Sequence, residues 1–367
     1  MLKKFRISAN FIFEVIVWLL VAIICLSAIS YISANGNGFE VFTKRSIDNA
    51  NMDMPYKAVY DIDSEKVYNI TVNWKSGIVE LKTYSGENIR VTEYSSEELN
   101  IDNALSYSTG SSKLTLNWND TQNIYLGNLM PELKKKNITI EIPSDFILYD
   151  LKVNAGESYV SLTSITADTI NVRTSSKIEI VNCLTDEAKL TATNNGITAN
   201  GLSSNSLKAS SKTGSVSLEN TIGYTSDIST ISGDIVFTGS YRNLDCSSIS
   251  GNITADTNIR TRTVDAHTVT GKLQVTLPSD DDAIILCKTM NGGIGSSFTG
   301  VGNAKEYSIG DPVGAYSSEL MADGKNTDSI DNDKNFYKVS LSTTDGDIII
   351  NSGSQAQQPK ELFPEDK

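Results

Sequence analysis

A glycine-centred phrase recurs along this chain and constrains its fold more than any other feature. Residues 229–239 read STISGDIVFTG, residues 247–257 read SSISGNITADT, and residues 267–277 read HTVTGKLQVTL. Aligned on the glycine, apolar or small residues recur two and four positions after it and five and seven positions before it. This period of two is typical of β-strands and does not fit helical spacing. Each phrase predicts a strand, a tight turn at the glycine and a second strand.

The spacing of these glycines predicts a stacked repeat. Five of them are separated by 19, 18, 20 and 21 residues: Gly214, Gly233, Gly251, Gly271 and Gly292. A fixed period near twenty residues indicates units that stack on their neighbours. An upstream copy surrounds Gly77, and STTDGDIII at 342–350 is expected to close the domain. Because glycine tolerates positive φ, we expect Gly233 and Gly251 to occupy turns that reject a Cβ.

Two all-β architectures fit this pattern. In a β-solenoid each repeat pairs in parallel with the next, and equivalent side chains stack in columns. In an antiparallel β-sandwich each repeat is a hairpin, which Ser-Gly and Asp-Gly turns also suit. The single period and the conserved register of equivalent positions within the chain favour the solenoid. In either fold Ile235 and Ile253 are expected to point inward.

The N-terminus predicts a membrane anchor. The segment MLKKFR is basic, and residues 11–34 are apolar except for Glu14 and a few small polar residues. A helix of that length spans roughly 36 Å, enough for a hydrocarbon layer of about 30 Å. The preceding basic residues favour a cytoplasmic N-terminus and an exported remainder, in a single-pass protein of the cell membrane. The alternative is a cleaved signal peptide with its site near residues 28–30.

These features divide the chain into six segments. We predict a cytoplasmic N-terminus at 1–10, a transmembrane anchor at 11–34, a stalk at 35–60, an irregular β cap at 61–147, a regular β-repeat domain at 148–351 and a disordered tail at 352–367.

Charge and cysteine content exclude some classes of protein. The net charge of −13 repels nucleic-acid phosphates, so no nucleic-acid partner is expected. Cys183, Cys246 and Cys287 follow the predicted anchor, and an odd count does not suit a disulfide framework. We expect three buried small side chains, with a Cys246–Cys287 bridge as the minor alternative. The single histidine, His267, alternates outward.

No group of residues forms a recognisable catalytic or metal site, and no cofactor is expected. Carboxylates that act in polysaccharide hydrolysis must converge on one cleft. The acidic candidates are Asp280, Asp281 and Asp282 on a loop, with Asp227, Asp234 and Asp245 on neighbouring repeats. The loop at 321–334 holds Asp323, Asp328, Asp331 and Asp333 without the EF-hand order. We therefore expect no enzymatic activity, and we expect the lysines at 134–136 to form a solvated strand entry.

The combination of an anchor, an Ile142-Pro143 strand end and repeated T-x-S-G-x-I and T-x-D-G-D-I phrases resembles the bacterial putative-adhesin family of β-strand-repeat proteins. The resemblance covers roughly residues 66–351 and supplies no catalytic or binding residues. It implies a membrane-anchored, extracellular surface-binding module whose partner is a cell-wall or surface glycan or a protein. Members also look like accessory proteins of envelope-stress signalling, which implies the alternative role of contacting a membrane partner.

Overall fold

The structure is a computed structural model of the whole chain. It describes residue 47 and residues 50–65, 67–119, 135–257, 261–277, 283–297, 306–309 and 337–352. The chain divides into two units, Met1–Pro55 and Tyr56–Lys367. The described part of the first unit includes a short helical segment at residues 50–52. The second unit contains every described strand.

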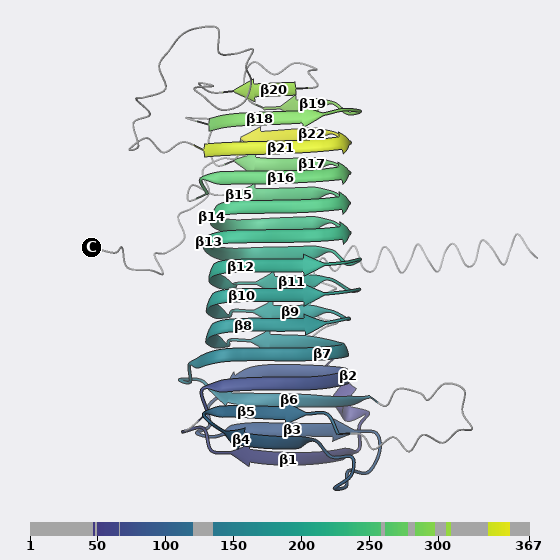
Figure 1. Cartoon of the computed structure of the whole chain (residues 1–367), viewed down its shortest axis with the longest axis vertical. Helices are drawn as coiled ribbons and strands as arrows, with labels where there is room; N and C mark the ends of the chain where they lie inside the picture. Colours follow the sequence, from purple (N-terminus) through teal and green to yellow (C-terminus); the bar gives the residue numbers. More distant parts are fainter. Residues whose placement is uncertain are drawn as a thin grey trace, which may run out of the picture. The chain divides into compact units, whose positions relative to one another are not determined.

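Strands dominate the second unit (Figure 1). The N-terminal strands are β1 (Tyr56–Ile62), β2 (Asn69–Tyr84), β3 (Ile89–Ser95), β4 (Ser106–Gly110), β5 (Lys113–Asn117) and β6 (Lys136–Pro143). The central strands are β7 (Leu148–Thr163), β8 (Thr166–Thr174), β9 (Ile178–Val181), β10 (Leu184–Ala192), β11 (Ile197–Asn200), β12 (Ser203–Ser211), β13 (Val216–Ser232) and β14 (Ile235–Ser250). The C-terminal strands are β15 (Ile253–Thr257), β16 (Thr263–Thr270), β17 (Leu273–Leu277), β18 (Ala283–Thr289), β19 (Ile294–Ser296), β20 (Glu306–Ile309), β21 (Tyr337–Asp345) and β22 (Ile348–Ser352).

Two ladders run through the second unit, and they are parallel except at their ends. The front ladder, which faces the viewer in Figure 1, contains the start of β2, then β7, β8, β10, β12, the second half of β13, most of β14, β16, β21 and β18 in that order. The back ladder contains the end of β2, the end of β7, then β9, β11, the starts of β13 and β14, β15, β17, β22 and β19. One front strand, a glycine turn and one back strand form a rung. This parallel stacking confirms the β-solenoid, and the sandwich of hairpins is wrong.

The core lies between the two ladders and follows from the period of two. Inward side chains from every rung join one cluster of buried apolar residues. Ile235 and Ile253 are fully buried in neighbouring back strands, so their predicted inward orientation is confirmed. Parallel strands stack equivalent positions about 4.8 Å apart. Branched aliphatic residues therefore recur at the same positions of each phrase because each packs on its own counterpart.

Antiparallel strands end the stack at its N-terminal side. On the back ladder β6 pairs with β3, and β3 pairs with β1. On the front ladder β5 pairs in parallel with β2 and forms a hairpin with β4. Short antiparallel strands of this kind reduce the length of parallel edge that the last rung leaves open.

A buried ion pair holds this N-terminal end together. Lys136 Nζ lies 3.0 Å from Glu93 Oε1, and both side chains are almost completely buried. The same ammonium group donates to the Asn119 carbonyl at 3.0 Å, and Glu93 Oε2 accepts from the Leu105 N–H at 2.8 Å. The prediction of a solvated lysine cluster at 134–136 is therefore wrong for Lys136. A buried charge is tolerated here because each partner is also hydrogen-bonded.

The C-terminal rungs are out of sequence order. The rung of β21 and β22 lies between the rung of β16 and β17 and the rung of β18 and β19. β18 pairs on its far side with the antiparallel strand β20. The sequence position of the phrase at 342–350 predicted that it closes the domain. This prediction is wrong. The phrase lies second from the end, between repeats whose glycines are only 21 residues apart in sequence.

No helix in the described parts of the chain is long and apolar enough to cross a membrane. The apolar segment 11–34 lies outside those parts, so the anchor stays a prediction.

Candidate functional site

The glycine turns form one edge of the stack, and close contact between rungs determines their residues. A Cβ on Gly251 would lie 2.1 Å from the carbonyl oxygen of Gly233, and a Cβ on Gly233 would lie 2.6 Å from that of Gly214. Neither Gly233 nor Gly251 has a positive φ. The predicted intolerance of a Cβ is therefore supported by the structure, but the reason is the close approach of the neighbouring rung.

In the C-terminal rungs the inward hydroxyl three positions before the glycine forms a hydrogen bond with the neighbouring turn. Its oxygen donates to the glycine carbonyl of the adjacent rung, at 3.1, 3.3 and 2.9 Å in three successive rungs. The donor and acceptor pairs are Thr268 and Gly251, Thr343 and Gly271, and Thr289 and Gly346. Each of these partly buried carbonyls thereby gains a side-chain hydrogen-bond partner. In these three rungs the T-x-x-G spacing places a hydroxyl against the glycine carbonyl of the neighbouring rung.

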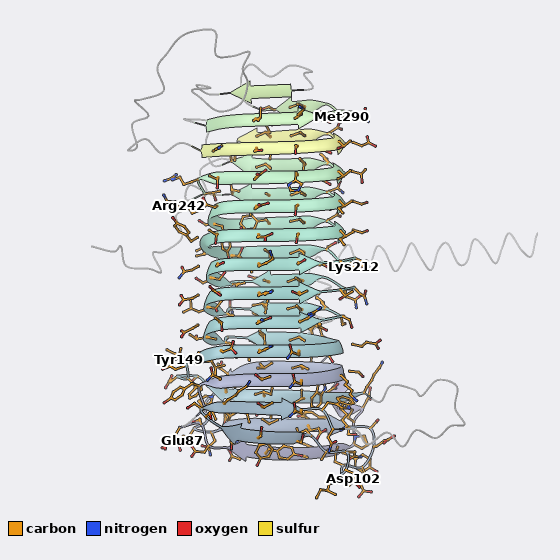
Figure 2. All side chains as sticks on the ribbon, in the orientation of Figure 1. Glu87, Asp102, Tyr149, Lys212, Arg242 and Met290 are labelled. Carbon is orange, nitrogen blue, oxygen red and sulfur yellow. The ribbon has the colours of Figure 1, made fainter. Side chains whose placement is uncertain are left out.

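Exposed aliphatic side chains gather along this edge in the C-terminal half of the stack. Ile231, Ile249, Val269 and Met290 are 48%, 54%, 45% and 60% exposed. Each directly follows the inward hydroxyl or its equivalent, so the ladder register aligns them, with Thr344 between the last two. We call these five residues the turn-edge row. Figure 2 shows Met290 at the same edge as Lys212, opposite the edge that carries Tyr149 and Arg242.

The fold does not require aliphatic residues at these positions. The equivalent positions in the three preceding rungs are Ser175, Thr193 and Lys212. Polar residues therefore serve the same turn in the N-terminal half. A row of exposed large aliphatic side chains in an otherwise polar surface is typical of a contact site for another molecule.

The front ladder carries a column of charged side chains that point outward. Asp227, Asp245 and Asp265 occupy equivalent positions of β13, β14 and β16. Lys208 precedes Asp227 in the same column and forms an ion pair with it, with 2.6 Å between Nζ and Oδ2. Partial burial and the carboxylates of Asp265 and Asp227 raise the pKa of Asp245. Like charges in register thus disfavour its ionised form.

This column contains two of the acidic candidates and one that sequence reasoning missed. Asp227 and Asp245 are neighbours, as consecutive repeats required. Asp234 lies instead at the turn, where its Oδ1 accepts from the Asn252 N–H at 2.7 Å. Asp265 was missed, although it lies six positions before its glycine, as Asp227 and Asp245 do. The signal for Asp265 is its place in the same outward column as Asp227 and Asp245.

Other sequence candidates are placed as expected or lie outside the described residues. His267 is exposed, and Cys183, Cys246 and Cys287 are buried with free thiols. Burial raises the pKa of Cys183 to about 11 and that of Cys287 to about 12. Residues 280–282 and 321–334 lie outside the described part of the chain. Within the described residues no three His, Cys, Asp or Glu side chains form a group that could hold a metal ion.

The register excludes the alternative disulfide. Cys246 pairs with Ala266, Ala266 with Leu341, and Leu341 with Cys287. Three strand spacings correspond to about 14 Å, roughly twice the largest Cα separation that a disulfide spans.

Comparison with known proteins identifies the repeat domain. A family model described as Toastrack DUF4097 matches residues 67–309. No curated protein matches the chain. Solved structures with a similar arrangement include a putative adhesin from Parabacteroides merdae, with 14% identity, a TM-score of 0.40 and coverage of 61% of this chain and 90% of that chain. A putative lipid binding protein from Parabacteroides distasonis has 12% identity, a TM-score of 0.47 and coverage of 82% and 97%. A putative adhesin from Bacteroides fragilis has 13% identity, a TM-score of 0.36 and coverage of 80% and 96%.

Proposed function

The chain belongs to the Toastrack DUF4097 family, and we propose that it is a non-catalytic binding module displayed outside the cell on a membrane anchor. The turn-edge row is the contact surface of this module. The observation that carries the proposal is the exposure of four large aliphatic side chains at a repeat position where the fold accepts serine, threonine or lysine. Burying such side chains against a partner is favourable by about 25 cal/mol per Å² of apolar surface.

The state of the reactive side chains supports a non-catalytic role. The thiols of Cys183 and Cys287 are buried, and their raised pKa values keep them protonated at neutral pH. A protonated, buried thiol is a poor nucleophile. The aspartates of the front ladder lie in a straight column along an outward surface. Catalytic carboxylate pairs must instead face each other across a bound substrate.

The sequence supports the placement outside the cell. The apolar segment 11–34 follows Lys3, Lys4 and Arg6, which favours a single-pass anchor with its N-terminus in the cytoplasm. The net charge of −13 repels nucleic-acid phosphates, so we propose no nucleic-acid partner. A protein or glycan of the cell envelope is the partner class that we propose.

The proposal is tested by crosslinking of the tagged full-length protein in living cells. The test variant combines Ile249→Ser and Val269→Ser. The control is Val236→Ser, because Val236 is a similarly exposed valine, at 38%, on the back ladder. We expect one crosslinked partner to be lost with the test variant and retained with the control. The purified partner should bind the test variant at least ~10-fold more weakly, as for a buried contact. Survival of the same adduct in the test variant would refute the contact surface.

The alternative role as a signalling accessory places the contact in residues 1–60. Replacing residues 1–34 by an unrelated anchor separates the two roles. A surface-binding module retains its partner after this replacement, whereas an accessory that contacts a membrane protein through its anchor loses it.

A further inference from the structure

Two outward columns of the front ladder carry opposite charge at their two ends. The central column has lysine in β10 and β12 and aspartate in β13, β14 and β16: Lys189, Lys208, Asp227, Asp245 and Asp265. The column at the start of the front strands has the reverse order. It has aspartate in β8 and β10 and arginine in β14 and just before β16: Asp168, Asp186, Arg242 and Arg262.

This segregation is costly within a single chain. Like charges directly opposite each other on neighbouring strands are destabilising. An alternating order of lysine and aspartate would have given an ion pair at every step. The chain has one such pair in the central column, between Lys208 and Asp227, and both side chains are about half exposed. Exposed pairs contribute little. The segregated charges are therefore explained better by a partner than by the stability of this fold.

A two-fold axis between β12 and β13 makes both columns self-complementary. The axis runs parallel to the strands, so it reverses the order of the rungs and keeps the position along each strand. It places β12 opposite β13 of a second copy, β10 opposite β14, and β8 opposite β16. Lys208 then faces Asp227 of the second copy, and Lys189 faces Asp245. By the same axis Asp186 faces Arg242 and Asp168 faces Arg262.

The two columns lie at different positions along the strands, and the same two-fold axis pairs opposite charges in both. A parallel arrangement, with the axis along the stack, places Lys208 against Lys208 and Asp245 against Asp245. Only the antiparallel arrangement pairs opposite charges in both columns. Complementary charge of this kind specifies orientation as well as partner.

The shape of the front ladder permits the approach. Near the axis the outward residues beside the central column are short, namely Ser206, Thr225, Ser210 and Ser229. Tyr224 also lies next to the axis, 52% exposed, with the Arg242 guanidinium over its ring at 5.3 Å. Six strands of about nine residues give a surface of about 30 Å by about 29 Å, near the ~800 Å² per partner of a standard interface.

We propose that the front ladder binds a second copy of this chain, antiparallel, in a two-fold homodimer with its axis between β12 and β13.

A charge exchange tests the proposal with the full-length chain. Lys189 and Asp245 are three strand spacings apart in one chain, about 14 Å, so neither can compensate for the other within a copy. Lys189→Glu and Asp245→Lys should each increase the dimer dissociation constant at least ~10-fold. The double variant should restore dimerisation, because each new charge meets its opposite across the axis. Molar mass by light scattering over a concentration series, at low and high salt, measures the dimer dissociation constant of each variant. Circular dichroism confirms that each variant folds.

The dimerisation of the wild type and the variants supports or overturns the proposed dimer. Loss of the dimer in both single variants with recovery in the double variant supports the two-fold axis, as does dissociation at high salt. A wild-type chain that is monomeric at every concentration overturns the proposal. A dimer that persists in both single variants, or that the double variant fails to restore, also overturns it.

Discussion

Thr268 donates its hydroxyl to the carbonyl oxygen of Gly251, one rung away, at 3.1 Å. The same oxygen lies where a Cβ on the glycine of the Thr268 rung, Gly271, would come within 2.2 Å. One carbonyl thus requires both a hydroxyl and a glycine from the neighbouring phrase. In this pair of rungs the hydroxyl and the glycine of the phrase are therefore both determined by the same neighbouring carbonyl oxygen.

Gly251→Ala should therefore destabilise the solenoid. The added Cβ meets the backbone oxygen of Gly233 at 2.1 Å, and backbone cannot move aside as a flexible side chain can. We expect a loss of about 1–3 kcal/mol, in the range of overpacked sites, measured by urea unfolding. Gly110→Ala is the control, because nothing lies within 4 Å of its Cβ position. Equal stability of the two variants would contradict the close approach.

Loss of one partner of the Lys136–Glu93 ion pair should lower the free energy of unfolding far more than loss of both partners. Glu93→Gln leaves a buried ammonium group without its counter-charge, and removal of one partner of a buried pair costs about 3–5 kcal/mol. Lys136→Met combined with Glu93→Gln should recover part of that loss. A double-mutant cycle on unfolding free energies measures the coupling. Additive effects of the two changes would show that the pair is not coupled.

Removing residues 337–367 should unfold the C-terminal part of the stack. β21 and β22 lie between two rungs, so their loss exposes buried residues such as Leu273 and Val275 of β17. We expect a large fall in melting temperature, followed by circular dichroism. Removing only residues 353–367 should leave the melting temperature unchanged. A stable product of the longer truncation would mean that the rung of β18 and β19 can pack directly on that of β16 and β17.

The stability of the monomer should depend on pH through Asp245. Its pKa is raised in the folded state by partial burial and by Asp265 and Asp227, while His267 and Lys208 act in the opposite sense. Between the unfolded value, about 3.9, and the raised folded value, the folded state binds more protons. Stability therefore falls as pH rises through that window.

Asp245→Asn removes this dependence and should be more stable than the wild type above the window. Urea unfolding over a pH series at low protein concentration, where self-association is weakest, measures the difference. Asp256→Asn, at an exposed aspartate of the back ladder, is the control. Wild-type and Asp245→Asn curves that stay parallel throughout would contradict the repulsion.

The sequence predicted the parts of this fold that depend on local periodicity. The inward columns that include Ile235 and Ile253 follow from alternation alone. The reason for Gly251 could not be read, because the atom that excludes its Cβ belongs to another rung. The burial of Lys136 was not predicted because its partner Glu93 lies 43 residues away in the sequence. The two residues meet only when the strand of Glu93 pairs with the strand of Lys136 in the folded cap.

The candidate surfaces were predictable to a similar degree. Asp227 and Asp245 were found because they repeat at a visible period. The turn-edge row needed exposure as well as register, since an aliphatic residue such as Ile249 next to a turn also fits a buried position. The order of the last rungs was not predicted because the sequence spacing from Gly271 to Gly292 is close to the spacing of glycines in rungs that are neighbours in the stack.

The placement of β21 and β22 also limits how an array of this kind can lengthen. A tandem duplication among residues 214–271 inserts a repeat between neighbours that already share its register. A repeat added after residue 352 would follow strands that are paired on both sides, and it would find no free edge beside them. Growth by duplication is therefore confined to the interior repeats, and the C-terminal phrase is held in place by the rungs on either side of it.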